Sequence, residues 1–142
     1  MLKICFVCHG NICRSPMAEF IMKDKVKKLS REKDFLISSR ATSYEEEGND
    51  MYPAAKEMLE EKGIPYTRHF AKRLEKSDYN KFDLFICMEE YNIKNISYIF
   101  QDPDNKVIKL LDKDIADPWY TGNFISTYND LEKGINEFLN TH

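Results

Sequence analysis

Cys8 and Arg14 stand near the start of the chain with five residues between them, a Cys-x5-Arg spacing. A cysteine thiolate is a strong nucleophile, and a guanidinium binds two oxygens of a tetrahedral anion with its planar fork. Cationic groups and helix N-termini favour ionisation of a nearby thiol. The pair therefore indicates nucleophilic chemistry on a bound oxyanion such as a phosphate, provided that the fold brings the two side chains together.

The residues around this pair predict a strand, a tight loop and the start of a helix. Residues 4–7 are apolar and indicate a short buried strand. Gly10 and Asn11 follow, and both tolerate positive φ at little cost. We expect Ser15 to cap a helix, with Pro16 at its first position. A turn that leads into a helix N-terminus points backbone N–H groups into one concavity, which suits an anion.

The rest of the chain alternates apolar runs with segments of helical periodicity. Such alternation favours an α/β fold with a parallel sheet covered on both faces. The polar segments 40–50 and 114–122 are expected to be loops. Gly134 lies inside the last predicted helix, where glycine costs roughly 1 kcal/mol relative to alanine. The predicted strands are 35–39, 82–88 and 107–111, and the predicted helices are 16–29, 53–62, 71–78, 91–100 and 124–139.

The charge balance and length exclude several classes of protein. A net charge of -3 argues against nucleic acid as a partner. No apolar run approaches the roughly 18 residues of a membrane span, and no secretory signal is evident. We therefore expect a cytoplasmic monomer that does not bind membranes. The length of 142 residues predicts one domain over 1–142.

The four cysteines do not form a recognisable metal or haem site. Cys5 and Cys8 are three apart, so on a strand their side chains point to opposite faces. The run from Cys5 to His9 formally matches a haem attachment sequence, but nothing indicates export or a haem pocket. A zinc site including Cys13 would lack a second ligand pair at the usual spacing. We expect no metal and no cofactor.

Residues 7–16, Val-Cys-His-Gly-Asn-Ile-Cys-Arg-Ser-Pro, resemble the signature loop of the low-molecular-weight protein tyrosine phosphatases, V-C-x-G-N-I-C-R-S-P, at every specified position. The resemblance implies a three-layer, flavodoxin-like fold with a four-stranded parallel sheet in the order 2-1-3-4. It also implies metal-independent hydrolysis of phosphotyrosine in proteins, and of small aryl phosphates, through a cysteinyl-phosphate intermediate. The phosphate would be bound by His9, Gly10, Asn11, Ile12, Cys13 and Arg14.

The resemblance assigns roles to single residues. Cys8 would be the nucleophile and Arg14 the phosphate-binding cation. Asp117, in an Asp-Pro pair after the last predicted strand, occupies the place of the family's general acid, although such a pair alone indicates only a turn. The Ser15 hydroxyl would donate to the Cys8 sulfur, and Asn11 would brace the loop.

The family surrounds its phosphate site with aromatic side chains from two loops. Trp119 and Tyr120 follow the acid, and Tyr44 lies in the polar segment 40–50, so these three residues would form the pocket walls. The same segment contains Glu45–Glu47, whose charge would favour substrates with basic flanks.

The sequence leaves the roles of Cys13 and Glu89 open. Cys13 matches the cysteine with which the family forms a reversible disulfide to its nucleophile, and its other possible role is loop packing. Met88-Glu89 departs from the Met-Asp pair that is frequent in the family, which weakens any role assigned to this acid.

Two other classes of protein share parts of this pattern. Thioredoxin-coupled arsenate reductases have a similar loop but need a further pair of redox cysteines after the third strand, where only Cys87 is available. Cysteine phosphocarriers of sugar transport would require neither Arg14 nor Asp117. Both classes remain alternatives to a phosphatase.

Overall fold

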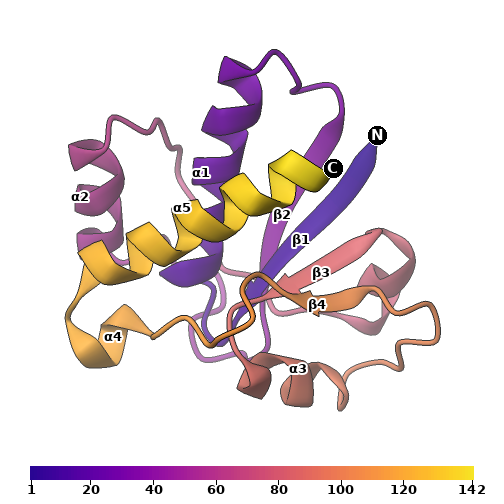
Figure 1. Ribbon diagram of the computed structural model, residues 1–142. Coiled ribbons are helices and arrows are strands. Elements are labelled where there is room, and N and C mark those ends of the chain that lie inside the picture. The colour runs from indigo at the N-terminus through magenta and orange to yellow at the C-terminus, as the bar shows by residue number, and fades with distance from the viewer.

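The computed structural model describes residues 1–142, and a four-stranded parallel sheet lies at its centre. The strand order is β2-β1-β3-β4, which confirms the predicted order (Figure 1). Parallel strands align all their carboxyl ends at one edge, where folds of this type bind ligands. The strands are β1 (Leu2–Cys8), β2 (Phe35–Ala41), β3 (Leu84–Cys87) and β4 (Val107–Lys109).

Helices cover both faces of the sheet and complete three layers. α1, α2 and α5 pack together on one face, while α3 lies on the other (Figure 1). The predicted helices at 16–29, 53–62, 91–100 and 124–139 are all found, with ends shifted by a few residues. The helices are α1 (Arg14–Lys28), α2 (Pro53–Glu61), α3 (Glu90–Ile96), α4 (Pro118–Thr121) and α5 (Phe124–Thr141), with a 3-10 helix at Lys76–Asn80.

The period-two alternation of β1 divides its side chains between two cores. Ile4, Phe6 and Cys8 face the larger core beneath α1 and α5. Cys5 and Val7 face the smaller core beside α3. Cys8 is the last residue of β1, so its sulfur emerges at the carboxyl edge of the sheet on the α1 side.

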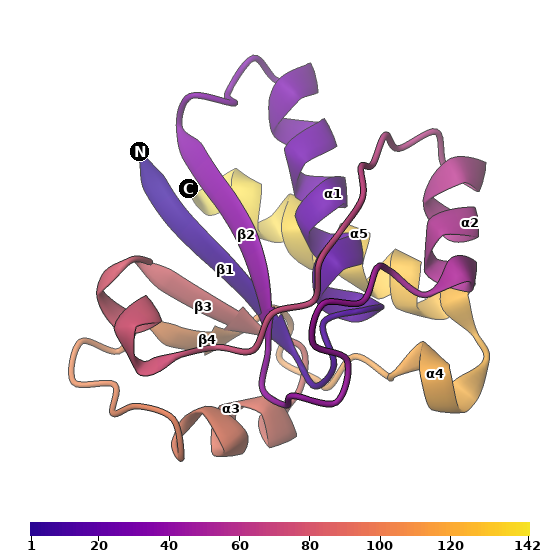
Figure 2. The same ribbon diagram turned by 180° about the vertical axis from the view of Figure 1, so that it is seen from behind.

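The connection between α2 and β3 differs from its prediction as a helix over 71–78. Residues 71–75 are extended, and Arg73 forms a parallel bridge with Ala41 at the end of β2. Ala41 N donates to Lys72 O and Leu74 N donates to Ala41 O, so these backbone groups are not available for a helix. Figure 2 shows this segment running from α2 past the start of α1 to the sheet. It therefore lies behind the loop that follows β1.

Gly134 lies where α5 crosses the end of β4. A Cβ atom at this position would lie 2.5 Å from the Leu110 Cγ atom, far inside van der Waals contact. Glycine thus permits the close approach of the helix, which offsets its poor helix propensity.

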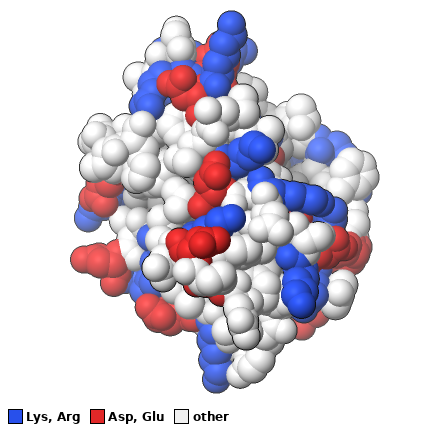
Figure 3. All heavy atoms as spheres, turned by 90° about the vertical axis from the view of Figure 1, so that its right-hand side faces the viewer, with Lys and Arg blue, Asp and Glu red and all other residues white.

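Basic and acidic side chains are interspersed on the face of the molecule drawn in Figure 3. Among the helices, none combines the length and apolar character that a membrane crossing requires.

Candidate active site

A pocket opens at the carboxyl end of β1, where the loop of residues 8–14 turns into α1. Most residues expected in the site from sequence are brought together here. The pocket is lined by residues 8–14, Glu45, Glu46, Asp117, Trp119 and Tyr120.

Cys8 lines this pocket, and the residue is only 3% exposed. The Asn11 backbone N–H donates to the Cys8 sulfur at 3.3 Å, and the Ser15 Oγ atom lies 3.0 Å away. Because Asn11 Nδ2 donates to Ser15 Oγ at 2.7 Å, the Ser15 hydroxyl hydrogen remains available to point at the sulfur. Two hydrogen-bond donors thus surround the sulfur.

Ser15 does not cap α1 as predicted. The helix begins two residues earlier than predicted, at Arg14, and its preceding residue Cys13 makes no side-chain cap. The Ser15 hydroxyl is used by Cys8 and Asn11 instead. Pro16 consequently lies at the third position of the helix rather than at its first. This position is still within the first turn, so the missing N–H of Pro16 leaves no intrahelical bond unmade.

Asn11 holds the loop in shape from inside. Its φ is 59°, the left-handed conformation predicted for it, whereas Gly10 does not have positive φ. His69 Nε2 donates to the Asn11 carbonyl at 2.7 Å, and the Lys72 backbone N–H donates to its side-chain oxygen at 3.1 Å. The side-chain Nδ2 of Asn11 also donates to Ser39 Oγ at 3.0 Å, and the Ser39 hydroxyl donates in turn to the Glu19 carboxylate of α1.

This bracing network contains residues that the sequence did not reveal as part of the site. His69 and Lys72 belong to the connection between α2 and β3, and Ser39 belongs to β2. Ser39 Oγ donates to Glu19 Oε1 at 2.6 Å. None of them falls in a motif, because their roles depend on contacts between segments far apart in the chain.

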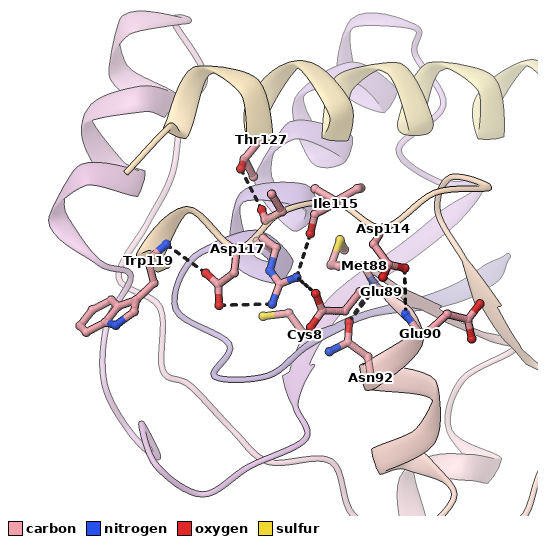
Figure 4. Close-up of polar contacts among 12 residues, drawn as sticks. Cys8, Met88, Glu89, Glu90, Asn92, Asp114, Ile115, Asp117, Trp119 and Thr127 are labelled. Carbon is pink, nitrogen blue, oxygen red and sulfur yellow. Dashed lines mark hydrogen bonds and ion pairs between the residues drawn. The ribbon is translucent and has the colours of Figure 1, made fainter. Parts of the chain in front are cut away.

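Arg14 is 2% exposed and donates three side-chain hydrogen bonds, to Glu89, Ile115 and Asp117, all of which are labelled in Figure 4. Its Nη1 donates to Glu89 Oε2 at 3.0 Å and to the Ile115 carbonyl at 2.9 Å, and its Nη2 donates to Asp117 Oδ2 at 3.4 Å. Burial alone would lower the pKa of Arg14, but the negative charges of Cys8, Glu89 and Asp117 raise it above its ordinary value. The guanidinium is therefore both charged and fixed in position.

Asp117 reaches the pocket from the first turn of α4, within a segment expected to be an irregular loop. Its Oδ1 accepts from the Trp119 N–H at 3.0 Å, so the carboxylate caps the helix. Thr127 Oγ1 of α5 donates to the Ala116 carbonyl at 3.0 Å and anchors the preceding residue. Figure 4 shows the Asp117 carboxylate and the Cys8 sulfur facing the same space.

The aromatic wall of the pocket consists of Trp119 and Tyr120, which are 53% and 82% exposed. The Trp119 ring packs edge-on against Tyr52, with ring centroids 4.8 Å apart. Tyr52 in turn stacks on Phe124 at 6.1 Å, and its backbone N–H donates to the Ile12 carbonyl in the loop of residues 8–14, the predicted phosphate loop. Tyr52, which the sequence analysis did not single out, thus connects the wall to the loop.

Tyr44 does not line the pocket, contrary to expectation. It is 66% exposed, and the Arg73 guanidinium lies over its ring at 4.6 Å. The same loop presents Glu45 and Glu46 to the pocket instead. The backbone N–H groups of Thr42 and Ser43 donate to the carbonyls of Cys8 and His9, which anchors the start of this loop beside the pocket. In the loop anchored this way, Glu45 and Glu46 line the pocket and Tyr44 does not.

Cys13 lines the pocket as a buried free thiol, and all four cysteines are free. Burial raises its pKa well above the ordinary value for cysteine, and the charges of Cys8 and Asp117 raise it further. Cys13 directly precedes α1, so it lies where the loop joins the helix.

Comparison with known proteins agrees with this geometry. A family model described as "Low molecular weight phosphotyrosine protein phosphatase" matches residues 3–141. The low molecular weight protein-tyrosine-phosphatase PtpA of Staphylococcus saprophyticus is 34% identical, over 99% of this chain and 93% of the relative.

Solved structures show the same likeness. The low molecular weight protein tyrosine phosphatase SP-PTP of Streptococcus pyogenes is 39% identical with a TM-score of 0.91, over 99% of this chain and 93% of the other. YfkJ of Bacillus subtilis is 30% identical with a TM-score of 0.93, over 99% and 94%. With the signature loop, the sheet order and the family match in agreement, the chain belongs to the low molecular weight phosphotyrosine protein phosphatase family.

Proposed function

We propose that this protein hydrolyses phosphotyrosine in proteins, and small aryl phosphates, through a cysteinyl-phosphate intermediate. The observation that supports this most directly is the convergence of the Cys8 sulfur, the Arg14 guanidinium and the Asp117 carboxylate on one pocket. A nucleophile, an anion-binding cation and a proton donor are the groups that phosphate ester cleavage requires. Membership of the family supports the same substrate class.

In the first step the Cys8 thiolate attacks phosphorus in line with the ester oxygen. The S–P bond forms as the P–O bond breaks, and Asp117 transfers its proton to the leaving phenolate. The amides of residues 9–14 and the Arg14 fork bind the equatorial oxygens as charge spreads over them. A bound dianion also offers Arg14 Nη2 a new acceptor in place of Asp117.

In the second step a water molecule attacks phosphorus opposite the sulfur. Asp117, now a carboxylate, accepts a proton from this water. The S–P bond breaks, the Ser15 hydroxyl stabilises the departing thiolate, and inorganic phosphate is released. The protein returns to its starting state with Cys8 and Asp117 as they were.

The depth of the pocket supports a preference for aryl over alkyl phosphates. Cys8 is buried, whereas Trp119 and Tyr120, which line the same pocket, are exposed. A phenyl ring is long and flat enough to fill this space while its phosphate reaches the loop. Aromatic pairs add roughly 0.5–1.5 kcal/mol beyond area burial, which would orient such a ring.

The two alternative classes receive less support. Cys87 is fully buried in the smaller core, on the face of the sheet away from Cys8, so it does not offer the exposed second thiol that a reductase relay needs. A phosphocarrier needs neither Arg14 nor Asp117, so that function would not account for the contact between these two side chains in the pocket.

Hydrolysis of p-nitrophenyl phosphate in the presence of a chelator tests the proposal. We expect turnover by the wild type, none by Cys8→Ser, and wild-type turnover by the control Cys87→Ala. Rapid acid quenching followed by mass spectrometry should find phosphate on the peptide that contains Cys8. Turnover that survives Cys8→Ser, or that requires added metal, would overturn the mechanism.

A further inference from the structure

The pocket that surrounds Cys8 also contains two carboxylates, those of Glu45 and Glu46. The loop that presents them is fixed to the phosphate loop, because the Thr42 N–H donates to the Cys8 carbonyl and the Ser43 N–H donates to the His9 carbonyl. These backbone bonds are 3.0 and 3.1 Å long. The backbone that presents the two glutamates is thus anchored beside the pocket.

Glu46 lies directly over the phosphate loop. A Cβ atom on Gly10 would be 3.5 Å from the Glu46 Cγ atom, and Asn49 Nδ2 donates to Glu46 Oε2 at 2.7 Å. Burial raises the pKa of Cys13, and the negative charge of Glu46 raises it further. Glu45 is 70% exposed at the rim and contacts His9 Nε2 at 3.3 Å.

Neither carboxylate forms an ion pair with a lysine or arginine of this chain, and Glu45 meets only the His9 ring. Glu47, the third member of the run, is different: its Oε2 accepts from the Arg73 backbone N–H, and it does not line the pocket. Two unpaired carboxylates beside a site for a dianion repel that ligand. The repulsion is offset only when the ligand itself carries positive charge nearby.

We propose, building on the phosphatase function proposed above, that Glu45 and Glu46 select protein substrates in which lysine or arginine directly neighbours the phosphotyrosine. With the phosphate on the loop, the tyrosine spans the depth of the pocket and its neighbours in the peptide reach the rim. A long basic side chain there can donate to both carboxylates. Trp119 and Tyr120 on the remaining wall carry no charge, so the selection depends on the two glutamates.

Phosphotyrosine peptides that differ only in the neighbours of the phosphotyrosine test this inference. Versions with lysine, alanine and glutamate should rank in that order by kcat/KM, with lysine about three- to tenfold above alanine at low salt. High salt should reduce the difference because these groups are solvent-accessible. Glu45→Gln/Glu46→Gln should abolish the ranking and should lower the KM for p-nitrophenyl phosphate, since the repulsion of a substrate without positive charge is removed. The opposite effects on the two substrates distinguish charge selection from a loss of structure.

Glu47→Gln is the matched control and should keep both the ranking and the wild-type KM. Wild-type protein that hydrolyses p-nitrophenyl phosphate but turns over the three peptides equally would overturn this inference and leave the phosphatase function standing. A ranking that persists in the double variant would also overturn it. No hydrolysis of p-nitrophenyl phosphate by the wild type would overturn the proposed function itself, and this inference with it.

Discussion

Glu89 Oε2 accepts a hydrogen bond from Arg14 Nη1 at 3.0 Å and thereby joins the residue that begins α3 to the phosphate loop. The same side chain takes part in a capping box with Asn92 at the start of α3. The direction of the Arg14 fork is therefore set partly by the position of α3. Glu89 acts as a positioning residue, in the place where the family frequently has aspartate.

Glu89→Gln removes the charge while keeping the length of the side chain. A hydrogen bond to a charged group contributes about 1.5–3 kcal/mol, so we expect kcat/KM for p-nitrophenyl phosphate to fall about tenfold or more. The adjacent Glu90→Gln is the control, because Glu90 is exposed and pairs with Lys109 away from Arg14. Equal kinetics in both variants would show that Asp117 and Ile115 suffice to orient the guanidinium.

Asp117→Asn should affect substrates according to their leaving groups. The Asn oxygen can still accept from the Trp119 N–H, so α4 stays capped while the proton donor is lost. We expect kcat/KM for phenyl phosphate to fall about 10²- to 10⁴-fold and that for p-nitrophenyl phosphate to fall much less, because p-nitrophenolate leaves without a proton. Equal losses on the two substrates would contradict a role as general acid.

Asn11 can be tested by separating its backbone from its side chain. Asn11→Gly keeps the left-handed conformation but loses the contacts to Ser15, Ser39 and Lys72, and Asn11→Ala adds backbone strain of about 1 kcal/mol or more. Both variants should lose at least about tenfold in kcat. Thermal unfolding should place the alanine variant below the glycine variant by about 2–4 °C. An alanine variant as stable as the glycine variant would show that the loop relaxes out of this conformation.

Tyr52 should control the position of Trp119, which is the only tryptophan and hence the source of the tryptophan fluorescence. Tyr52→Ala removes the ring beneath it, so we expect a red-shifted emission and a KM for aryl phosphates raised about three- to tenfold. Tyr52→Phe keeps the ring and should match the wild type in both measurements. A Tyr52→Ala variant with unchanged emission would show that Trp119 is held by other contacts.

Gly134→Ala should have two opposite effects on the stability of the fold, one from helix propensity and one from packing. Propensity alone predicts stabilisation by about 1 kcal/mol, but the new Cβ would lie 2.5 Å from Leu110 Cγ. We expect net destabilisation by about 1–3 kcal/mol in thermal or urea unfolding. In a Leu110→Ala background the same change should be neutral or stabilising, and additive effects across this double-mutant cycle would contradict the clash.

The α/β class and the centre of the pocket could be predicted because their signals are local, whereas the strand order 2-1-3-4 was implied by the resemblance to the phosphatase family. Strand and helix patterns alternate along the chain, and Cys8, Asn11 and Arg14 fall within one contiguous loop. Asp117 was predicted because the resembling family has its general acid in an Asp-Pro pair after the last strand. These residues need only the topology to bring them together.

The parts that could not be predicted depend on contacts between distant segments. His69 meets Asn11 across 58 positions, and Arg14 meets Glu89 across 75. The segment 71–75 has helical composition but pairs with the end of β2, where unpaired backbone groups of an edge strand were available. Tyr44 was expected in the pocket from its loop alone, yet the direction of a side chain within a loop depends on the anchoring of its ends.

His69 and Lys72 bond to Asn11, and Tyr52 bonds to Ile12, yet none of these three bracing residues lines the pocket. They fix the amide dipoles during folding, before any anion arrives. Binding then requires little loss of chain entropy, and the developing charge of the transition state meets dipoles that need no reorientation. In the proposed mechanism the rate therefore depends also on bracing residues that do not contact the substrate. Substitutions of these residues can change the rate while the signature loop keeps its sequence.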